Sequence, residues 1–467
     1  MSDTPVEYDF DVAMIGAGSG GFAAARTAVG AGLKPVVLEG GAEVGGLCIL
    51  RGCMPSKALL YAAEVRHLIQ RAGIWGIHPG RADFDFSEVM ARKQAMIRDF
   101  ADHRRKQLEQ GKFTFRRATA RFTDSHTLAL SDGSKLTARH FVISTGSVVA
   151  PAPLPELDEV GYLTSDDVFT LTRLPKSLIV LGGGAIAVEL AQFLARFDVK
   201  ITLIQRSGQL LRDFDADAAG EVEKALTEEG ITIHTQTRLV SAERVGDMKQ
   251  VTFESDGRMV KVGAEEILFA LGRIPNTAGL NLAAAGVATE KTRIVTADTM
   301  QTSVPHIYAV GDCTGPHEIV HIAIQQGEIA AHNIARPETP RHTDYRLLTS
   351  VVFTEPQLAV VGLTEKEAQV QNIPYLTASY PFNDHGKSLI MEALHGFVKL
   401  LADPQTGEII GGCCVGPLGG ELIHEINVAM AKRMTVHEFA VVPHYHPTLA
   451  EIWTYPAEEL AEKIPLS

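Results

Sequence analysis

The same strand–turn–helix–strand pattern occurs twice in the sequence, and this repeat constrains the fold more than any other feature. The first copy is DVAMIGAGSGGFAAARTAVGAGLKPVVLEGG, in which an apolar run from Val12 to Ile15 precedes a glycine-rich turn. The glycines of this turn are Gly16, Gly18 and Gly21. In such a G-x-G-x-x-G turn the first glycine permits the tight turn and the second a close approach to a pyrophosphate. The third lets the helix pack closely on the strand.

An acidic residue at the end of the next strand strengthens this prediction. Residues 22–29 have the pattern of a helix, Pro35 to Leu38 that of a strand, and Glu39 follows 23 residues after Gly16. A carboxylate at this place accepts hydrogen bonds from a ribose, and the helix N-terminus holds the pyrophosphate. The first copy therefore predicts a dinucleotide-binding βαβ unit rather than an ordinary glycine-rich turn.

The second copy, SLIVLGGGAIAVELAQFLARFDVKITLIQRSGQLLR, has a different residue at the place of the acid. Its turn carries Gly182, Gly184 and Ala187, and Gln205 and Arg206 follow the second strand. An acid there would repel a 2′-phosphate, whereas an arginine binds one through charge-assisted hydrogen bonds worth about 1.5–3 kcal/mol. We expect NADPH at this unit, with NADH possible, unless Arg206 is only a solvated surface charge.

Two dinucleotide-binding units in one chain indicate an enzyme with a flavin and a nicotinamide cofactor. VISTGS at 142–147 and FALGRIPNT at 269–277 each have the pattern of a strand end followed by a glycine turn, as at a crossover between domains. HIYAVGDC at 306–313 predicts a strand that ends in a turn, where an acid can accept hydrogen bonds from a polyol chain. The candidate cofactor-binding residues in these stretches are Thr145, Gly146 and Asp312 for the flavin and Gly272 for the nicotinamide.

Composition excludes several other classes of protein. The formal charge of −13 over 467 residues lacks the basic footprint of a nucleic-acid-binding surface. Five cysteines are too few for a disulfide-stapled secreted scaffold. The N-terminal MSDTPVEYDF has no features of a signal peptide, and no run of eighteen uncharged apolar residues predicts a membrane span. We expect a cytoplasmic protein, in which a cysteine pair is catalytic or metal-binding rather than structural.

Two of the cysteines, Cys48 and Cys53, lie five positions apart in GGLCILRGCMPSK. On an ideal helix, residues five apart are separated by about 7.5 Å along the axis and about 140° around it. Because a disulfide needs Cα atoms about 4.4–6.8 Å apart, an undistorted helix cannot join them. Gly52 lets the chain bend, and a helix can start around Pro55. Cys53 would then lie at a helix N-terminus, which lowers a thiol pKa, and Arg51 would act in the same direction.

The two alternatives to a redox pair are a zinc site and inert buried cysteines. A zinc site would need further ligands at short spacing, which this stretch lacks.

This stretch resembles the redox-disulfide motif of the flavoprotein disulfide reductases, which include glutathione reductase, dihydrolipoamide dehydrogenase and mercuric reductase. The two nucleotide fingerprints, GRIPN, AVGD and HYHPTLAE at 444–451 also match the family, in family order. The resemblance implies an α/β fold with two Rossmann-like dinucleotide-binding domains, for FAD and NAD(P), and a C-terminal α+β dimerisation domain. The implied division is 1–150 for the first part of the FAD domain, 151–275 for the NAD(P)H domain, 276–345 for the return to the FAD domain and 346–467 for dimerisation.

The resemblance also implies roles for individual residues. Cys53 is the thiolate beside the flavin, and Cys48 is the outer thiol that attacks the substrate. Lys57 matches a lysine near the flavin, and Glu189 the glutamate that pairs with it; without the motif, Lys57 would be a surface lysine on a helix. His446 matches the catalytic acid–base histidine, which in a homodimer reaches the redox pair of the partner subunit.

Glu451 matches the acid that orients this histidine, and His444 is expected to support it. Arg206 and Arg212 match arginines that bind the 2′-phosphate in glutathione reductases. The vicinal Cys413 and Cys414 lie in an apparent buried strand, where packing is favoured over an auxiliary thiol or metal-handling pair.

The substrate is less well defined than the reaction. Arg26 matches an arginine that contacts glutathione in the reductases of that tripeptide, but Glu328 stands where those enzymes carry another arginine. KALL after the cysteine motif and HPTLAE are more similar to dihydrolipoamide dehydrogenases. We predict electron transfer from NADPH through FAD and a Cys48–Cys53 disulfide to a small-molecule or lipoyl disulfide. The alternatives are a metal-ion reductase of the mercuric type, a diaphorase or oxidase that uses quinone or oxygen, and a non-catalytic subunit.

Overall fold

The computed structural model describes residues 7–465, which divide by their contacts into two compact units. Within the described residues, the first unit comprises residues 7–56, 90–151 and 272–343, and the second comprises residues 57–89, 152–271 and 344–465. Helix α3 (Cys53–Arg71) continues from the first unit into the second, and α4 (Phe86–Glu109) continues from the second into the first.

The first unit is built on a seven-stranded sheet whose parallel part carries the first glycine-rich turn. Strand β1 (Phe10–Ile15) pairs in parallel with β2 (Pro35–Leu38) on one side and with β6 (Lys135–Ile143) on the other. Strand β3 (Thr114–Arg116) extends the sheet beyond β2, and β18 (Ile307–Ala309) pairs in parallel with β6. Strands β5 (Thr127–Leu130) and β4 (Ala120–Phe122) add an antiparallel edge.

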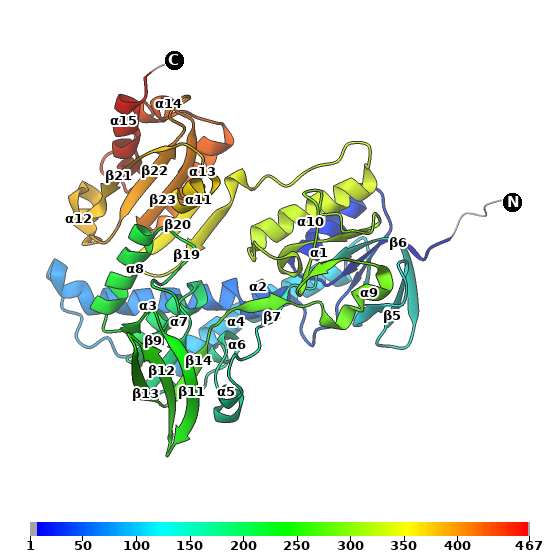
Figure 1. Ribbon diagram of the computed structural model, residues 1–467, viewed down its shortest axis with the longest axis horizontal. Helices are drawn as coiled ribbons and strands as arrows, with labels where there is room; N and C mark the ends of the chain where they lie inside the picture. Colours follow the sequence, from blue (N-terminus) through cyan, green and yellow to red (C-terminus); the bar gives the residue numbers. More distant parts are fainter. Residues whose placement is uncertain (1–6, 466–467) are drawn as a thin grey trace. The chain divides into compact units, whose positions relative to one another are not determined.

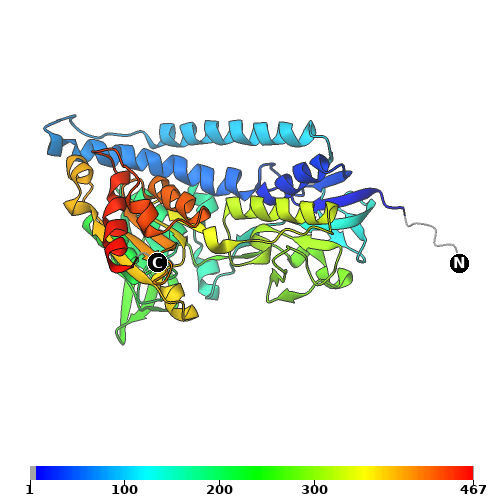
Figure 2. The same ribbon diagram turned by 90° about the horizontal axis from the view of Figure 1, so that it is seen from above.

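Both faces of this sheet are buried, which explains why β1 has a continuous apolar run rather than an alternating pattern. Val12 and Met14 belong to a core cluster on one face, and Ala13 and Ile15 to a cluster on the other. Helices α1 (Ser19–Gly30) and α10 (Val320–Ala335) cover the first face and lie side by side in Figures 1 and 2. A side chain at Gly327 of α10 would come within 2.2 Å of the Gly20 carbonyl oxygen of α1, so the two helices touch through their backbones.

The remaining elements of the first unit are short. They are α2 (Gly46–Arg51), β7 (Ser147–Val149), β15 (Arg273–Pro275), η2 (Ala278–Leu280), α9 (Leu282–Ala285), β16 (Thr289–Glu290), β17 (Arg293–Ile294) and η3 (Gly311–Thr314). Strand β15 pairs with β7 in an antiparallel ribbon.

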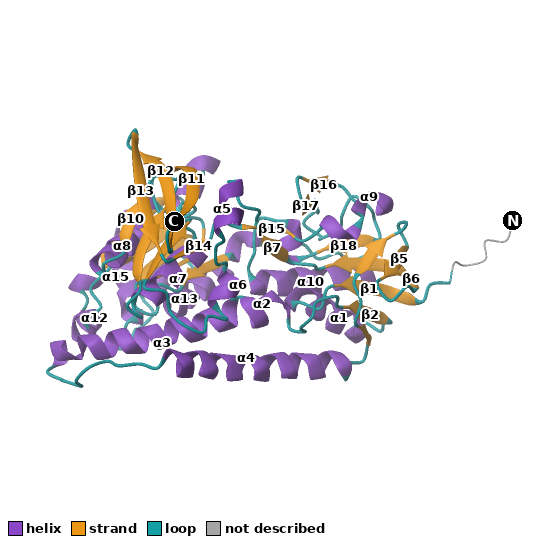
Figure 3. Ribbon diagram, turned by 90° about the horizontal axis from the view of Figure 1, so that it is seen from below, coloured by secondary structure: helices purple, strands orange, loops and turns teal. Residues whose placement is uncertain are grey.

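The second unit begins with a parallel sheet that repeats the pattern of the first. Strand β8 (Ser177–Leu181) pairs in parallel with β9 (Lys200–Ile204) and with β14 (Glu266–Phe269), and β10 (Thr232–His234) follows β9. Helix α7 (Ala185–Ala195) connects β8 to β9, and α8 (Ala216–Glu228) connects β9 to β10. A three-stranded antiparallel sheet, visible as orange arrows in Figure 3, follows as β11 (Arg238–Val245), β12 (Met248–Ser255) and β13 (Arg258–Ala264). The short helices α5 (Pro155–Val160), α6 (Ser165–Val168) and η1 (Ala72–Trp75) belong to the same unit.

The C-terminal part of the second unit is a five-stranded antiparallel sheet with helices. The strand order is β19 (Thr349–Val352), β20 (Gln357–Gly362), β23 (Ile409–Gly416), β22 (Phe397–Ala402) and β21 (Leu376–Pro381). Its longer helices are α11 (Glu365–Gln371), α12 (Gly386–Met391), α13 (Gly419–Ala431), α14 (Val436–Ala440) and α15 (Thr454–Lys463). The short turns η4 (Tyr345–Leu347), η5 (Phe382–Asp384) and η6 (Ala450–Trp453) complete it.

The predicted fold class is confirmed: two parallel sheets with glycine-rich turns are followed by an α+β segment. Among residues 7–465, no helix combines the length and the apolar character that a membrane crossing requires.

Candidate active site

The first glycine-rich turn connects β1 to α1 and fits a dinucleotide. A side chain at Gly16 would lie 2.4 Å from the Ser144 carbonyl oxygen, and one at Gly21 would lie 2.1 Å from the Gly16 carbonyl oxygen. A side chain at Gly18 would meet no protein atom within 4 Å. The two outer glycines are therefore needed for packing, whereas the middle one borders open space that a pyrophosphate can approach. Glu39 accepts a hydrogen bond from the Ala17 N–H at 3.1 Å, so its carboxylate lies at the same turn.

The other flavin candidates lie at the same edge of this sheet, after β6 and β18. Ser147 donates a hydrogen bond from its hydroxyl to Asp312 at 2.7 Å, and Arg273 donates to the Ser147 hydroxyl at 2.8 Å. The carbonyl oxygens of Thr145 and Gly146 accept hydrogen bonds from the side chain and the backbone N–H of Asn276, at 3.3 and 2.9 Å. Sequence reasoning missed Ser147 and Arg273, which fix the position of Asp312.

The second glycine-rich turn repeats this packing in the second unit. A side chain at Gly182 would lie 2.3 Å from the Ala270 carbonyl oxygen, while one at Gly184 would meet nothing within 4 Å. Ala187 is buried in α7. Gly183, which lies between the two, is close to Gln205, because a side chain there would lie 3.0 Å from the Gln205 amide carbon.

The predicted nicotinamide-site arginines that follow strand β9 are accessible. Arg206 and Arg212 are exposed, and the Arg212 Nε lies 3.5 Å from the Asp213 carboxylate. Gly272 has a left-handed backbone, with φ of +118°, and belongs to the first unit. Its carbonyl oxygen accepts a hydrogen bond from the Ala150 N–H at 3.1 Å.

The two cysteines of the redox motif are separated by a break between two helices, as the spacing predicts. Helix α2 ends at Arg51, Gly52 has φ of −136° and ψ of −116°, and α3 begins at Cys53. Both cysteine side chains are half-buried. The hydrogen bond with Cys53, together with burial, raises the pKa of the Cys48 thiol.

Two arginines near these cysteines differ in their partners. Arg51, which the sequence suggested as an activator of the thiol, is exposed and lies 3.3 Å from the Glu43 carboxylate. This ion pair offsets part of its charge. Arg104, which comes from α4 and which no motif marked, acts on the pKa of Cys48 in the lowering direction.

Lys57 and Glu189 form the ion pair that the family motif implies. The Lys57 ammonium donates hydrogen bonds to both carboxylate oxygens of Glu189, at 2.8 and 3.1 Å, and lies 4.4 Å from the centroid of the Phe353 ring. Glu189 also accepts a hydrogen bond from the Phe353 N–H at 2.9 Å. The Glu189 side chain is 6% exposed and that of Lys57 33% exposed, so this pair is partly desolvated.

His446 and Glu451 are in contact, and a second histidine shares the carboxylate. The His446 Nδ1 lies 3.0 and 3.1 Å from the two Glu451 oxygens, which orients a ring that is 78% exposed. On the other side of Glu451, the His385 Nε2 lies 3.3 Å from the carboxylate, and its Nδ1 lies 2.8 Å from the Ser388 hydroxyl. His385 is fully buried, and this burial lowers the pKa of its imidazole, while Glu451 opposes that change. His444 supports the segment through Glu425, at 2.6 Å.

The other three cysteines are buried. Cys413 and Cys414 are adjacent on strand β23, where successive side chains point to opposite faces of the sheet. Burial raises the pKa of Cys413 to about 12 and that of Cys313 to about 11, and it raises the pKa of Cys414 as well. This environment favours the packing interpretation of the pair over an auxiliary thiol.

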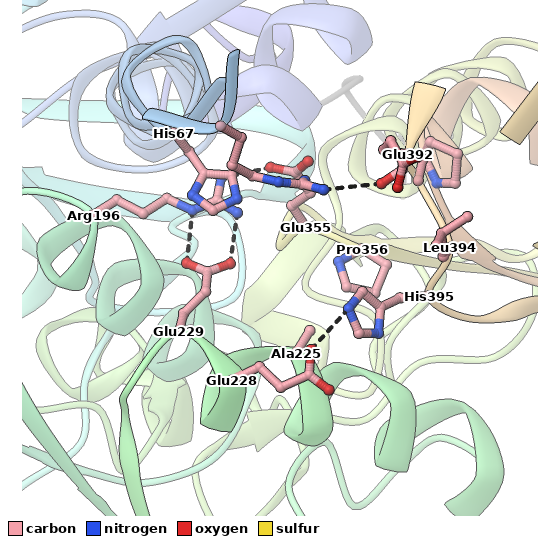
Figure 4. A pocket seen from close by; sticks show the side chains of 13 residues that line it. His67, Arg196, Ala225, Glu228, Glu229, Glu355, Pro356, Glu392, Leu394 and His395 are labelled. Carbon is pink, nitrogen blue, oxygen red and sulfur yellow. Dashed lines mark hydrogen bonds and ion pairs between the residues drawn. The ribbon is translucent and has the colours of Figure 1, made fainter. Parts of the chain in front are cut away.

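A pocket of about 290 Å³ in the second unit contains charged side chains that satisfy one another (Figure 4). Arg196 donates hydrogen bonds to Glu229 at 2.7 and 2.8 Å, and its Nη1 lies 2.7 Å from Glu355. The His395 Nε2 lies 3.1 Å from the Glu228 carboxylate. Because these charges are paired within the chain, the cluster is best explained as a structural network.

Comparison with known proteins identifies the family. The family model described as "Pyridine nucleotide-disulphide oxidoreductase" matches residues 10–327, and its dimerisation domain matches residues 348–457. The chain is 35% identical to a dihydrolipoyl dehydrogenase of Mycobacterium leprae, over 95% of this chain and 96% of the relative. It is 33% identical to a mercuric reductase of Bacillus cereus, over 95% of this chain and 70% of that relative.

A solved structure has the same fold. The HOCl-induced flavoprotein disulfide reductase RclA from Escherichia coli superposes with a TM-score of 0.85 at 24% identity, over 96% of this chain and 99% of that chain. The C-terminal match indicates a homodimer, and the family uses a flavin, FAD, together with a pyridine nucleotide. The chain belongs to the pyridine nucleotide-disulphide oxidoreductase family and is an FAD-dependent enzyme of the dihydrolipoyl dehydrogenase-like kind.

Proposed function

We propose that the protein uses NADPH to reduce a small-molecule or lipoyl disulfide through Cys48 and Cys53. The observation that carries this proposal is the placement of two half-buried cysteines in contact with each other, on either side of the break at Gly52. FAD, when bound, would supply two-electron redox chemistry between the nicotinamide and the disulfide of these cysteines.

The dithiol then performs thiol–disulfide exchange with the substrate. The Cys48 thiolate attacks one substrate sulfur, forms a mixed disulfide and displaces the other sulfur as a thiolate. Cys53 attacks Cys48 within the mixed disulfide, which releases the second substrate thiol and forms the Cys48–Cys53 disulfide. One disulfide is reduced to two thiols for each dithiol that is oxidised.

The protons of this exchange are assigned to His446. A histidine titrates near neutral pH, and the contact of its Nδ1 with Glu451 leaves Nε2 to give or take a proton at the sulfur. His446 is 78% exposed within its own chain, which suits a group that acts on a partner. We propose that the partner subunit's His446 completes each site, so that a monomer lacks the proton donor.

The preference for NADPH is proposed from the residues after β9. Gln205 is neutral, and Arg206 and Arg212 are exposed near the same strand end. These positions leave two guanidinium groups available to a 2′-phosphate. For FAD, we propose Glu39 at the ribose, Asp312 at the polyol chain and the Lys57 ammonium near the ring, where a cation stabilises negative charge.

The four-part domain division also stays a proposal. The contact-based units change at residues 56/57, 89/90, 151/152, 271/272 and 343/344. The last three changes lie close to the boundaries 150/151, 275/276 and 345/346 that the sequence predicts, and the first two fall within the predicted segment 1–150. The agreement at these three boundaries supports a chain that passes from an FAD domain to an NAD(P)H domain, back to the FAD domain and on to a dimerisation domain.

The test is the oxidation of NADPH and NADH by the purified holoenzyme with oxidised glutathione, lipoamide, Hg(II) or Cu(II) as acceptor. We expect NADPH to be preferred and one disulfide to be turned over rapidly, with loss of that activity in Cys48→Ser. Quinone or oxygen turnover that survives this substitution, with no disulfide turnover in the wild type, would assign a diaphorase instead. Cysteine-dependent turnover of Hg(II) or Cu(II) alone would assign a metal-ion reductase.

A further inference from the structure

A fully buried histidine lies next to the His446–Glu451 pair and comes from a different part of the chain. His385 is the residue just before helix α12, and its side chain is 0% exposed. A side chain at Gly386, the first residue of α12, would lie 4.0 Å from the His446 Cε1. The start of this helix therefore borders the imidazole to which the protons of the exchange are assigned.

The His385 ring has contacts on two sides. Its Nδ1 lies 2.8 Å from the Ser388 hydroxyl oxygen, and Ser388 is also fully buried. Its Nε2 lies 3.3 Å from the Glu451 Oε1, the same oxygen that is 3.1 Å from the His446 Nδ1. One carboxylate therefore lies between a buried imidazole and an exposed one.

Aromatic packing fixes the plane of the His385 ring. The rings of Phe382 and Tyr455 both lie edge-on to it, each with its centroid 6.4 Å away. Tyr455 is in turn stacked on Tyr380, with centroids 4.0 Å apart. The imidazole is therefore held in place by its neighbours, independently of Glu451.

The chemistry of the two polar neighbours determines where the His385 proton lies. An ionised carboxylate only accepts hydrogen bonds, whereas a hydroxyl can donate one. The Nε2 atom therefore carries the hydrogen on the side of Glu451, and Nδ1 accepts a hydrogen bond from the Ser388 hydroxyl. Burial lowers the pKa of this imidazole, so the ring is neutral at neutral pH and offers a donor without adding a second positive charge.

The Nε2 atom of His385 is close to its acceptor but not aligned with it. It is buried and makes no hydrogen bond within residues 7–465, although Glu451 is only 3.3 Å away. Buried polar nitrogens are normally paired, and hydrogen bonds in active sites commonly align only when the substrate is bound. A rotation of the Glu451 carboxylate would complete the bond and keep the contact with His446, because both carboxylate oxygens lie 3.0–3.1 Å from the His446 Nδ1.

We infer that His385 is a positioning residue for the disulfide reaction: its Nε2–H orients the Glu451 carboxylate, which orients His446. This inference rests on the proposed function, in which His446 gives and takes the protons of the exchange. Side-chain exposure rises along this series of contacts, from 0% at His385 to 10% at Glu451 and 78% at His446. Packing at the buried end thus determines the orientation of the imidazole at the exposed end.

The first test compares His385→Leu with His385→Gln in the holoenzyme. Leucine has no donor, whereas glutamine carries its amide nitrogen as many bonds from Cβ as histidine carries Nε2. We expect H385L to lower kcat with the disulfide substrate about tenfold, the loss expected for a hydrogen bond to a charged group, without a change in KM. H385Q should restore most of this kcat, because it keeps a donor for Glu451.

The matched control is His395→Leu. His395 belongs to the same unit and also pairs with a carboxylate, that of Glu228 at 3.1 Å, but it has no contact with Glu451. H395L should leave kcat with the disulfide unchanged. Quinone reduction with NADPH, measured for every variant, should also stay unchanged, because it needs the fold and the flavin but not His446.

The second test asks whether His385 acts through Glu451. H385L is combined with Glu451→Gln, and the factor by which it lowers kcat is compared in the two backgrounds. Because the E451Q amide carries no charge for His385 to orient, H385L should lower kcat by less than about twofold in that background. A role in maintaining the fold would instead lower kcat by the same factor in both.

Three results would overturn the inference and leave the proposed function intact. They are a wild-type kcat in H385L, an equal effect of H385L in both backgrounds, and a loss in H385Q as large as that in H385L. A parallel fall of quinone reduction in H385L would likewise show a structural role and overturn it. Failure of the wild type to reduce any disulfide, with quinone reduction retained, would overturn the proposed function and this role with it.

Discussion

The free energy that the partly buried Lys57–Glu189 ion pair contributes to folding can be measured and compared with a value expected from the structure. Glu189 accepts two hydrogen bonds from Lys57 and one from the Phe353 N–H. Glu189→Gln keeps an oxygen for the Phe353 N–H and removes the charge, while Lys57→Met removes the ammonium and keeps most of the side-chain volume. The pair of substitutions and their double mutant form a thermodynamic cycle that isolates the interaction.

The expected coupling lies between the values for exposed and buried pairs. Exposed ion pairs contribute about 0.2–1 kcal/mol, and removal of one partner of a fully buried pair costs about 3–5 kcal/mol. Glu189 is nearly buried at 6% exposure, but Lys57 is 33% exposed, so solvent screens about a third of the pair. We therefore expect a coupling free energy of about 2 kcal/mol.

The assay is urea unfolding of the holoenzyme followed by circular dichroism, for the wild type, the two single variants and the double variant. Arg105→Gln with Asp102→Asn provides the reference cycle, because that i,i+3 pair is about half exposed on both sides and should couple by less than about 0.5 kcal/mol. Additive effects of the Lys57 and Glu189 substitutions, within about 0.3 kcal/mol, would refute the reasoning, since they would mean that the observed contacts carry no net energy.

Three further predictions concern the glycine turn, the proton donor and the buried thiols. Gly18→Ala should leave the melting temperature of the apoprotein unchanged and weaken FAD binding at least about tenfold. Gly21→Ala should lower the melting temperature by overpacking, because its side chain would lie 2.1 Å from a carbonyl oxygen. Equal melting temperatures of the two variants would contradict this prediction. Glu451→Gln should lower disulfide turnover about 10²-fold, because it removes the carboxylate that orients His446, and it should leave quinone reduction unaffected. A parallel fall of both activities would instead indicate a folding defect. Iodoacetamide at pH 8 should label the half-buried Cys48 and leave Cys413 unmodified in mass spectra, because Cys413 is 4% exposed and closed off from the reagent within β23. Rapid labelling of Cys413 would show that β23 opens.

The sequence predicted those parts of the site that depend on residues close together in the chain. Each glycine turn needs specific residue types within six positions, and the break between the two cysteines follows from helix geometry and Gly52. The buried strand that carries Cys413 and Cys414 likewise follows from its own apolar run.

The residues that the sequence did not mark come from segments that meet only in the folded chain. Arg104 lies toward the C-terminal end of the polar helix α4, where an arginine has the pattern of a solvated residue, and it becomes distinctive only by its position over Phe22. His385 lies outside any motif, and its contact with Glu451 joins positions 66 residues apart. For Arg51, sequence proximity suggests an effect on the thiol, and the fold adds a contact with Glu43 that the sequence did not mark.

The break at Gly52 places the two sulfurs on separate helices, α2 and α3, which are joined by this single residue. Cys48 belongs to a six-residue helix and Cys53 to the first turn of a nineteen-residue helix, so a bond between them would join the short helix α2 to the long helix α3. A methyl group at position 52 would lie 3.0 Å from the Leu47 carbonyl oxygen and 3.2 Å from the Cys48 Cα. It would therefore displace α2 at the break, so the close approach of the two sulfurs depends in part on the absence of a side chain at residue 52.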